Sequence, residues 1–135
     1  MRVSGILHTP KKPGDVGYDL ELVEDTHVWP GQCVWARTGV RLQLPEGVWC
    51  EIVGRSSTMH NYGIQVQHSI IDTGYTGELT VGLLNTGRTS QRFEEGTRLA
   101  QVIFRTAVLP SVQLVREEEI GETVRGSQGF GSTGR

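Results

Sequence analysis

Short runs of alternating apolar and polar residues recur along the chain, and glycine or proline lies between most of them. In residues 40–44 (VRLQL) the valine and both leucines fall on one face of an extended chain, and Pro-Glu-Gly then ends the run as a turn. The remaining strand candidates are residues 48–53, 63–66, 78–85, 98–105 and 112–116. The pattern predicts a chain made mostly of short antiparallel strands.

No window shows a sustained apolar stripe at helical spacing. Only residues 56–62 predict a helix, of about two turns, with Ser56 or Ser57 as its cap. Glycine makes up 18 of the 135 residues, roughly twice its usual share, and it punctuates the apolar runs as it does in the turns of β proteins. We therefore expect an all-β fold: an antiparallel, jelly-roll-like barrel with at most one short helix.

Length and charge narrow the range of functions. A chain of 135 residues, 36% of them hydrophobic, suits one domain with its own core. Its 13 basic and 15 acidic residues leave a net charge of −2, which disfavours binding to nucleic-acid backbones. The chain has no apolar run that could span a membrane, and its first residues lack the apolar stretch of a signal peptide. We expect a soluble cytoplasmic protein with no nucleic-acid or membrane partner.

The two cysteines and four histidines show none of the spacings that hold zinc. This pattern excludes the zinc-dependent nucleobase deaminases, which need a His or Cys followed by a PCxxC pair. Cys33 and Cys50 are expected to be reduced thiols.

One segment carries a candidate catalytic carboxylate. Residues 70–78 (IIDTGYTGE) read locally as a hairpin, with Asp72 and the glycines in the turn between two strands. In the functional interpretation, Asp72 is ionised near neutral pH and accepts a proton from water, and Tyr75 supplies an aromatic ring three residues on. The local pattern alone favours the hairpin.

Two further segments suit an anion. Residues 54–57 (GRSS) place the guanidinium fork of Arg55 beside two hydroxyls, although a surface turn with a helix cap fits this pattern as well. Residues 125–135 (RGSQGFGSTGR) are rich in glycine, whose backbone can curl into an anion-binding nest, and they contain Phe130, which can stack on a flat ring. As an isolated string this tail predicts a mobile segment. Residues 11–15 (KKPGD) predict a polar turn.

Five segments, in this order, resemble the five motifs of the trimeric dUTPases. They are VGYDL (16–20), GRSS (54–57), IIDTGYTGE (70–78), GTRLAQVIF (96–104) and RGSQGFGSTG (125–134). The resemblance implies hydrolysis of dUTP to dUMP and pyrophosphate, with Mg²⁺ as cofactor, in a homotrimer with shared active sites. It also implies a barrel over residues 1–124 and a flexible C-terminal lid, residues 125–135, that closes on a neighbouring subunit's site.

The resemblance assigns roles residue by residue. Asp72 matches the catalytic carboxylate that activates water for attack on the α-phosphorus, Tyr75 matches the ring beneath the deoxyribose, and Asp19 matches the acid that holds Mg²⁺ through water. Backbone groups of the hairpin before Asp72 would read uracil. The substrate-binding positions are Arg55, Ser56, Ser57 and Gln101 on the phosphates, Ser69, Ile70 and Ile71 beside the base, and Arg125, Phe130, Gly131, Ser132 and Thr133 in the lid, where Phe130 would stack over uracil.

Two alternative functions stay open. The dCTP deaminases share the fold and have motifs close to GRSS and IDTGY, but the glutamate of their TLELSN-like segment is replaced here by Gly82. The other alternative is a nucleotide-dependent partner-binding protein of the same fold, and an additional protein partner is compatible with either activity.

Several positions depart from the family pattern or lie outside it. Ser69 stands where glycine is usual, and His68 precedes it, so either side chain could add a contact to the base or crowd it; a histidine here is more typical of a surface turn. Trp29 and Trp35 are typical of a core or a subunit interface.

Overall fold

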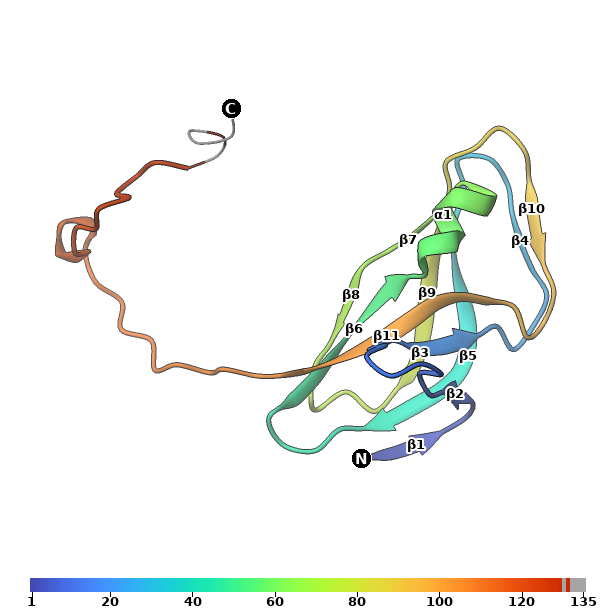
Figure 1. Cartoon of the computed structure of the whole chain (residues 1–135), viewed down its shortest axis with the longest axis horizontal. Coiled ribbons are helices and arrows are strands. Elements are labelled where there is room, and N and C mark those ends of the chain that lie inside the picture. The colour runs from blue at the N-terminus through green and yellow to red at the C-terminus, as the bar shows by residue number, and fades with distance from the viewer. Residues whose placement is uncertain (130, 132–135) are drawn as a thin grey trace.

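The computed structural model shows a β barrel from which the C-terminal segment extends away, and the structure describes residues 1–129 and 131 (Figure 1). In chain order the elements are β1 (Arg2–Ser4), β2 (Leu7–His8), β3 (Tyr18–Glu21), β4 (Thr26–Val28), β5 (Cys33–Gln43), β6 (Val48–Gly54), α1 (Ser56–Tyr62), β7 (Ile64–Val66), β8 (Ser69–Ile71), β9 (Glu78–Asn85), β10 (Gln91–Phe93), β11 (Arg98–Thr106) and the 3₁₀ turn η1 (Glu117–Glu119).

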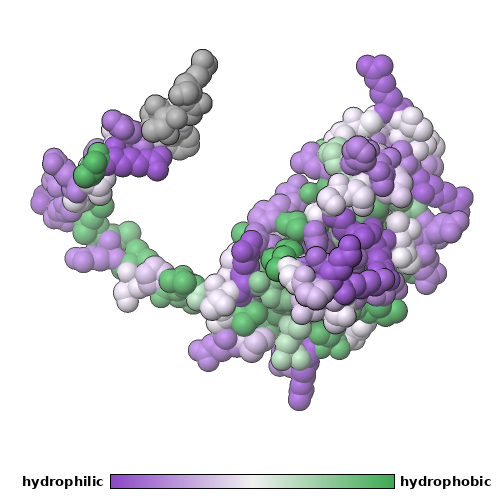
Figure 2. Space-filling model, viewed as in Figure 1, coloured by the Kyte–Doolittle hydropathy of each residue, from purple (hydrophilic) through white to green (hydrophobic). Residues whose placement is uncertain are grey.

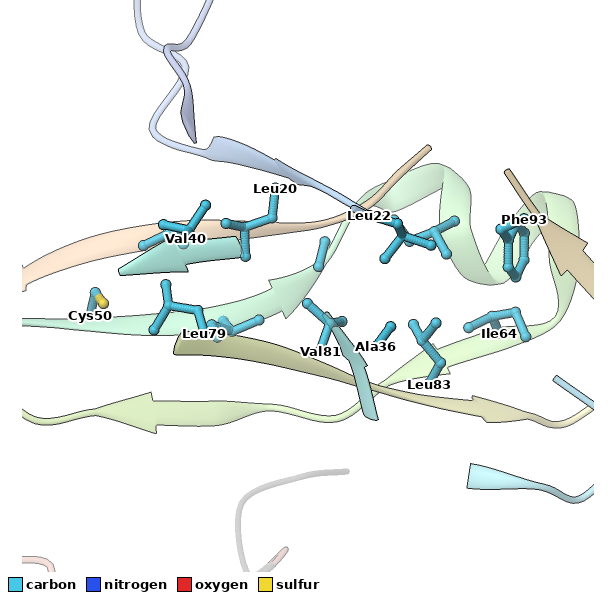
Figure 3. Packing of buried hydrophobic residues seen from close by; sticks show 14 of the residues in the cluster. Leu20, Leu22, Ala36, Val40, Cys50, Ile64, Leu79, Val81, Leu83 and Phe93 are labelled. Atoms are coloured by element: carbon cyan, nitrogen blue, oxygen red, sulfur yellow. The ribbon is translucent and has the colours of Figure 1, made fainter. Parts of the chain in front are cut away.

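Two antiparallel sheets and a small ribbon form the barrel. One sheet has the order β1-β5-β9-β7, the other has the order β2-β3-β11-β6-β8, and β10 pairs with β4. Leu20 of β3 and Leu79 and Val81 of β9 point into the space between the two sheets, and all three are buried (Figure 3). The apolar positions of the alternating runs therefore face one core, and the predicted all-β, jelly-roll-like class is confirmed.

Most predicted strands match observed ones closely. Residues 48–53, 63–66, 78–85 and 98–105 correspond to β6, β7, β9 and β11, and residues 40–44 overlap the second half of the longer β5. The predicted strand at 112–116 is wrong, because that segment pairs with none of the strands that the structure describes. Its alternating pattern is real, but a strand also needs a neighbour for its backbone groups.

The helix is where the sequence predicts it, but its cap is not. The residue before the first turn is Arg55, with extended backbone, and no side chain caps the helix. The first turn of α1 is instead bound to β11. Arg55 N–H donates to Leu99 O at 3.2 Å, and the Thr58 hydroxyl donates to the same oxygen at 2.7 Å. Gly63 ends α1 in the left-handed region, with φ of 63°.

The hairpin predicted for residues 70–78 is also wrong. β8 pairs with β6 in the five-stranded sheet, whereas β9 pairs with β5 and β7 in the other sheet. The segment between them therefore crosses from one sheet to the other at the edge of the barrel. A local turn signal specifies a reversal of the chain but not which strands then pair.

After β11 the chain leaves the barrel as an extended segment (Figure 1). Ala107 N–H still donates to Gly47 O at 2.7 Å. The following residues include large apolar side chains, seen as green patches along the extension in Figure 2, that are at least 80% exposed: Val108, Leu109, Val112, Leu114 and Val124. So much exposed apolar surface in one segment is typical of an interface. Within the described residues, none of the helices is long and apolar enough to cross a bilayer.

Candidate functional site

A cleft of about 550 Å³ opens beside the start of α1. Its lining includes Asp19, Arg55, Ser56 and Gln101, four of the residues to which the motifs assign phosphate or metal contacts. Strand register explains why these residues meet. Gln101 of β11 pairs with Asp19 of β3 on one side and with Val53 of β6 on the other, and Arg55 follows directly after β6. Three distant motifs thus converge at one end of the five-stranded sheet.

Asp19 holds two arginines at the floor of this cleft. Its carboxylate lies 3.2 Å from Arg55 Nε and 3.8 Å from Arg98 Nη1, and Arg55 Nη1 donates to Arg98 O at 3.1 Å. The Arg55 side chain is therefore oriented by two partners and keeps further N–H groups for a ligand. The motif assignment gave Arg98 no role; its place in the ion pair depends on a strand pairing that the sequence pattern does not specify.

Gln101 is positioned by a glycine that the sequence analysis left without a role. Gln101 Nε2 donates to Gly54 O at 3.1 Å. A Cβ at Gly17 would lie only 1.7 Å from Gln101 Oε1, so a side chain at position 17 would force the glutamine out of its place. Gly17 is thus needed for a close approach, in the middle of the VGYDL motif.

A second, smaller pocket of about 170 Å³ contains the residues of the third motif. It is lined by Ser69, Ile70, Ile71, Asp72 and Tyr75, together with Trp35 and the first residues of β9. Asp72 is exposed, and Tyr75 is 46% exposed. The predicted base, sugar and catalytic positions therefore do lie together.

Local bonds fix the crossing segment that carries Asp72. Tyr75 N–H donates to Asp72 O at 3.0 Å, the Thr73 hydroxyl donates to Val48 O at 2.6 Å, and the Tyr75 hydroxyl donates to Glu78 O at 2.9 Å. A Cβ at Gly77 would clash with the Tyr75 ring, at 2.4 Å from its hydroxyl oxygen. The tyrosine ring is thus packed against its own loop.

Glu78 ties this loop to β5. Its carboxylate accepts a hydrogen bond from Gly39 N–H at 2.8 Å and from Arg37 Nε at 3.3 Å, and Arg41 Nε donates to Thr76 O at 2.8 Å. The bond from Gly39 N–H, and then that from Arg37, lowers the pKa of Glu78. Glu78 ends the third motif, but the sequence pattern gives no sign of this anchoring role.

Glu51 plays a similar part for the residue just before β8. On β6 its carboxylate accepts from Arg105 Nε at 2.8 Å and lies 2.8 Å from His68 Nε2. Arg105, and then His68, lower the pKa of Glu51. His68 is therefore bound to the sheet through Glu51, although it remains half-exposed as expected for a turn residue.

The two pockets lie at opposite ends of β6. Asp72 follows Ile71, which pairs with Cys50, and Thr73 bonds to Val48; Arg55 follows the other end of the strand. With a rise of about 3.3 Å per residue, the six steps along the chain from Trp49 to Arg55 span about 20 Å. One subunit therefore does not bring Asp72 and Tyr75 together with Arg55 and Gln101.

The remaining predicted positions fall outside both pockets. Ser57 is half-buried on α1 and lines neither cavity. Arg125 lies in the segment after η1, where its Nε donates to Gln128 O at 2.7 Å. Gly131 is described and has φ of 94°. Phe130, Ser132 and Thr133 lie outside the described residues. In the described part of the chain, no three His, Cys, Asp or Glu side chains gather as a metal site.

Comparisons with known proteins agree on one family. A family model described as dUTPase matches residues 4–134. The deoxyuridine 5′-triphosphate nucleotidohydrolase of Paramecium bursaria Chlorella virus 1 is 40% identical over 121 residues, which cover 90% of this chain and 84% of that protein. The protein of the same name from Clostridium novyi is 38% identical over 125 residues, covering 90% and 85%.

Solved structures show the same fold at lower identity. The Staphylococcus bacteriophage 80alpha dUTPase, solved with dUpNHpp, superposes with a TM-score of 0.90 at 23% identity, covering 99% of this chain and 98% of that one. A mutant dUTPase of phage phi11, whose structure is described as showing the coordination of a structural Mg(II) ion, superposes with a TM-score of 0.80 at 20% identity, covering 88% and 98%. The family match over nearly all of the chain is decisive: this chain belongs to the dUTPase family.

Proposed function

We propose that this protein hydrolyses dUTP to dUMP and pyrophosphate. The observation that carries this proposal is the cleft in which three distant motifs place Arg55, Ser56 and Gln101 around Asp19, in a chain of the dUTPase family. A guanidinium fork, a hydroxyl and an amide are groups that bind phosphate oxygens well. The triphosphate would lie in this cleft. Ser57 and the tail residues Arg125, Gly131, Ser132 and Thr133 are proposed as further phosphate contacts of the assembled enzyme.

The cleft also suits Mg²⁺ held with the substrate. Asp19 offers one carboxylate, already shared by two arginines, and such a site is too poor in ligands to hold a bare ion. Mg²⁺ keeps several waters and takes phosphate oxygens as ligands, so one carboxylate contact through water is sufficient. Asp19 would hold the ion in this way. When bound, the ion supplies neutralisation of charge on the phosphates.

The smaller pocket suits the nucleoside. β8 is the edge strand of its sheet, so those backbone N–H and C=O groups of Ser69, Ile70 and Ile71 that point away from β6 have no strand partner among the described residues and can bind the polar edge of uracil. The exposed Tyr75 ring would pack against the deoxyribose, where a flat surface leaves no space for a 2′-hydroxyl. Asp72 would orient the attacking water and take its proton.

A complete site then requires more than one subunit. Proton transfer needs contacts of about 3 Å, whereas Asp72 and Arg55 of one subunit are separated by about 20 Å along β6. We infer a homotrimer in which Asp72 of one subunit faces the cleft of another. Trp29 and Trp35 are 56% and 57% exposed, so the prediction of a core position is wrong for both, and an interface position remains.

The apolar extension after β11 would cover a neighbouring subunit, with residues 1–124 as barrel and arm and residues 125–135 as a lid over the neighbour's site. Phe130 in that lid would stack over uracil. Deletion of residues 125–135 should lower turnover about 100-fold and leave the melting temperature of the barrel unchanged, as calorimetry would show. Full activity of the shortened protein would overturn the lid.

The proposed activity is tested by product analysis. Incubation with dUTP, dCTP and dTTP in parallel, followed by ion-exchange chromatography, should yield dUMP from dUTP alone. A uracil nucleotide from dCTP would instead point to deamination. The structure argues against that result, because a Cβ at Gly82 would lie 2.8 Å from Gln67 Cβ and 3.1 Å from the Trp35 ring. The position has no space for the glutamate that a deaminase needs.

A further inference from the structure

The chain contains only two lysines, and they are adjacent. Of the 13 basic residues, 11 are arginines, and the two lysines are Lys11 and Lys12. They stand in a defined turn, in which Asp15 N–H donates to Lys12 O at 3.1 Å and Gly14 adopts φ of 90°. This turn forms one wall of the large cleft, and both lysines line it together with Arg55 and Ser56.

The charges of this cleft are unbalanced. Four cationic side chains line it, Lys11, Lys12, Arg55 and Arg98, against the two carboxylates of Asp15 and Asp19, an excess of two positive charges. Asp19 is shared by the two arginines. Neither lysine has a carboxylate within 4.0 Å among the residues that the structure describes. Asp15 stands in the same turn as the lysines, so one of the two excess positive charges lies on the lysine wall and the other on the arginine pair that shares Asp19.

We propose that Lys11 and Lys12 bind the polyphosphate chain of the substrate from this wall, as contacts outside the five motifs. A lysine is a point charge on a flexible stem, so it can follow phosphate oxygens without the fixed geometry that arginine requires. A triphosphate carries more negative charge than a monophosphate, so the excess positive charge of the cleft attracts it more strongly. The identification of the anion as dUTP rests on the proposed function. The binding of a polyphosphate in the cleft rests only on the charges of the cleft.

Because the lysines are exposed and act through charge, they contribute to binding and to capture of the substrate more than to the chemical step. The double variant Lys11→Gln/Lys12→Gln should raise KM for dUTP about tenfold and change kcat less than twofold. Its kcat/KM should also depend less steeply on salt than that of the wild-type protein. Inhibition by dUMP should stay unchanged.

Two matched variants control for charge and for fold. Arg88→Gln removes one exposed positive charge away from the cleft and should leave KM unchanged. Lys11→Arg/Lys12→Arg keeps both charges and should restore KM to within about twofold, because the contact needs charge and not a particular geometry. An unchanged KM in the glutamine variant, in a protein that hydrolyses dUTP, would overturn the lysine contacts and leave the proposed function intact.

Chemical labelling tests the same contacts without turnover. N-hydroxysuccinimidyl acetate acylates primary amines, which in this chain are the two lysines and the α-amino group of Met1. Tripolyphosphate should slow acetylation of Lys11 and Lys12 at least fivefold and leave Met1 unaffected, as peptide mass spectrometry would show. Equal labelling with and without tripolyphosphate would refute the proposal. Protection in a protein that fails to hydrolyse dUTP would keep the anion site and refute only the assigned substrate.

Discussion

The two pockets are built in different ways. The large cleft is assembled by strand register, which brings residues 19, 55 and 101 to one end of a single sheet and pairs the charges of Asp19 and Arg55. The smaller pocket is formed by a segment that crosses between sheets and is held by a hydrogen bond within the segment and by another to Val48 of β6. The cleft is thus a product of the whole barrel, and the Asp72 segment is a local structure on its edge.

The difference has a consequence for function. The cleft contains Arg55, Ser56 and Gln101, which we propose as phosphate-binding groups, whereas Asp72 lies exposed in a pocket that none of these residues lines. In the proposed function, phosphate binding and water activation are therefore assigned to separate parts of one chain. Variants of the two pockets should therefore lose activity for different reasons, and mixed assemblies of such variants should show whether the pockets meet between subunits.

The largest effect is expected at Asp72. Asp72→Asn keeps the shape of the side chain but removes its basicity, so kcat should fall about 1,000-fold while dUTP still binds in the intact cleft. Steady-state kinetics would measure the fall in kcat, and calorimetric titration with dUTP would measure binding. The matched control is Asp25→Asn, which changes an exposed carboxylate just before β4 and should leave the protein as active as the wild type. A comparable loss of dUTP affinity in Asp72→Asn would place this residue in binding instead.

Mixing subunits tests whether the two pockets meet across an interface. Arg55→Gln should be nearly inactive because it loses the oriented guanidinium. If Asp72 and Arg55 of one site come from different subunits, reassociation of equal amounts of Asp72→Asn and Arg55→Gln proteins should restore roughly a quarter of the wild-type activity. A site contained in one subunit would show no recovery at any ratio. Mass spectrometry of the intact assembly would confirm that mixed trimers had formed.

The sequence predicts the parts of the fold that depend on neighbouring residues, but not those that depend on residues far apart in the chain. β6, β9 and β11 follow from alternation and β-branched residues, which are local signals. The crossing at Asp72 does not, because residues 70–78 specify a turn but not that β8 and β9 join different sheets. Likewise the strand predicted at 112–116 has the right pattern but lacks a partner strand among the residues that the structure describes.

The same limit applies to the site residues. The motif resemblance identifies Asp19, Arg55 and Gln101, and the register then brings them together. Arg98 and Glu78 carry no local signal, because each acts through a residue far along the chain: Arg98 through Asp19, and Glu78 through Gly39. The lysine wall was in principle visible, since counting shows that the only two lysines are adjacent, but only the fold shows what they face.

A smaller effect is expected at Gly17, inside the cleft. Gly17→Ala forces Gln101 from its place, so KM for dUTP should rise about tenfold, the cost of one lost hydrogen bond to a charged group. Gln101→Ala should cause the same rise. The double variant should be no worse than either single one, because both remove one contact. Additive losses would show that Gly17 acts through the backbone and not through Gln101.

The smallest expected effect concerns the anchor of the Asp72 loop. The bonds from Gly39 N–H and Arg37 hold the pKa of Glu78 below its ordinary value, so its contribution to stability is full above about pH 4.5 and is lost as pH falls through the lower folded pKa. Glu78→Gln should therefore melt slightly below the wild type at pH 7, and the difference should shrink toward zero near pH 3.

Glu46→Gln, an exposed glutamate in the turn before β6, should show no such trend. Amide hydrogen exchange would show which residues lose protection. In Glu78→Gln at pH 7 this loss should be confined to residues 72–78 and 39. Because the loop is a local structure, loss of its anchor should loosen Asp72 and leave the phosphate cleft unchanged. Exchange that spread to β3 and β11 would instead mean that the two pockets are coupled through the barrel.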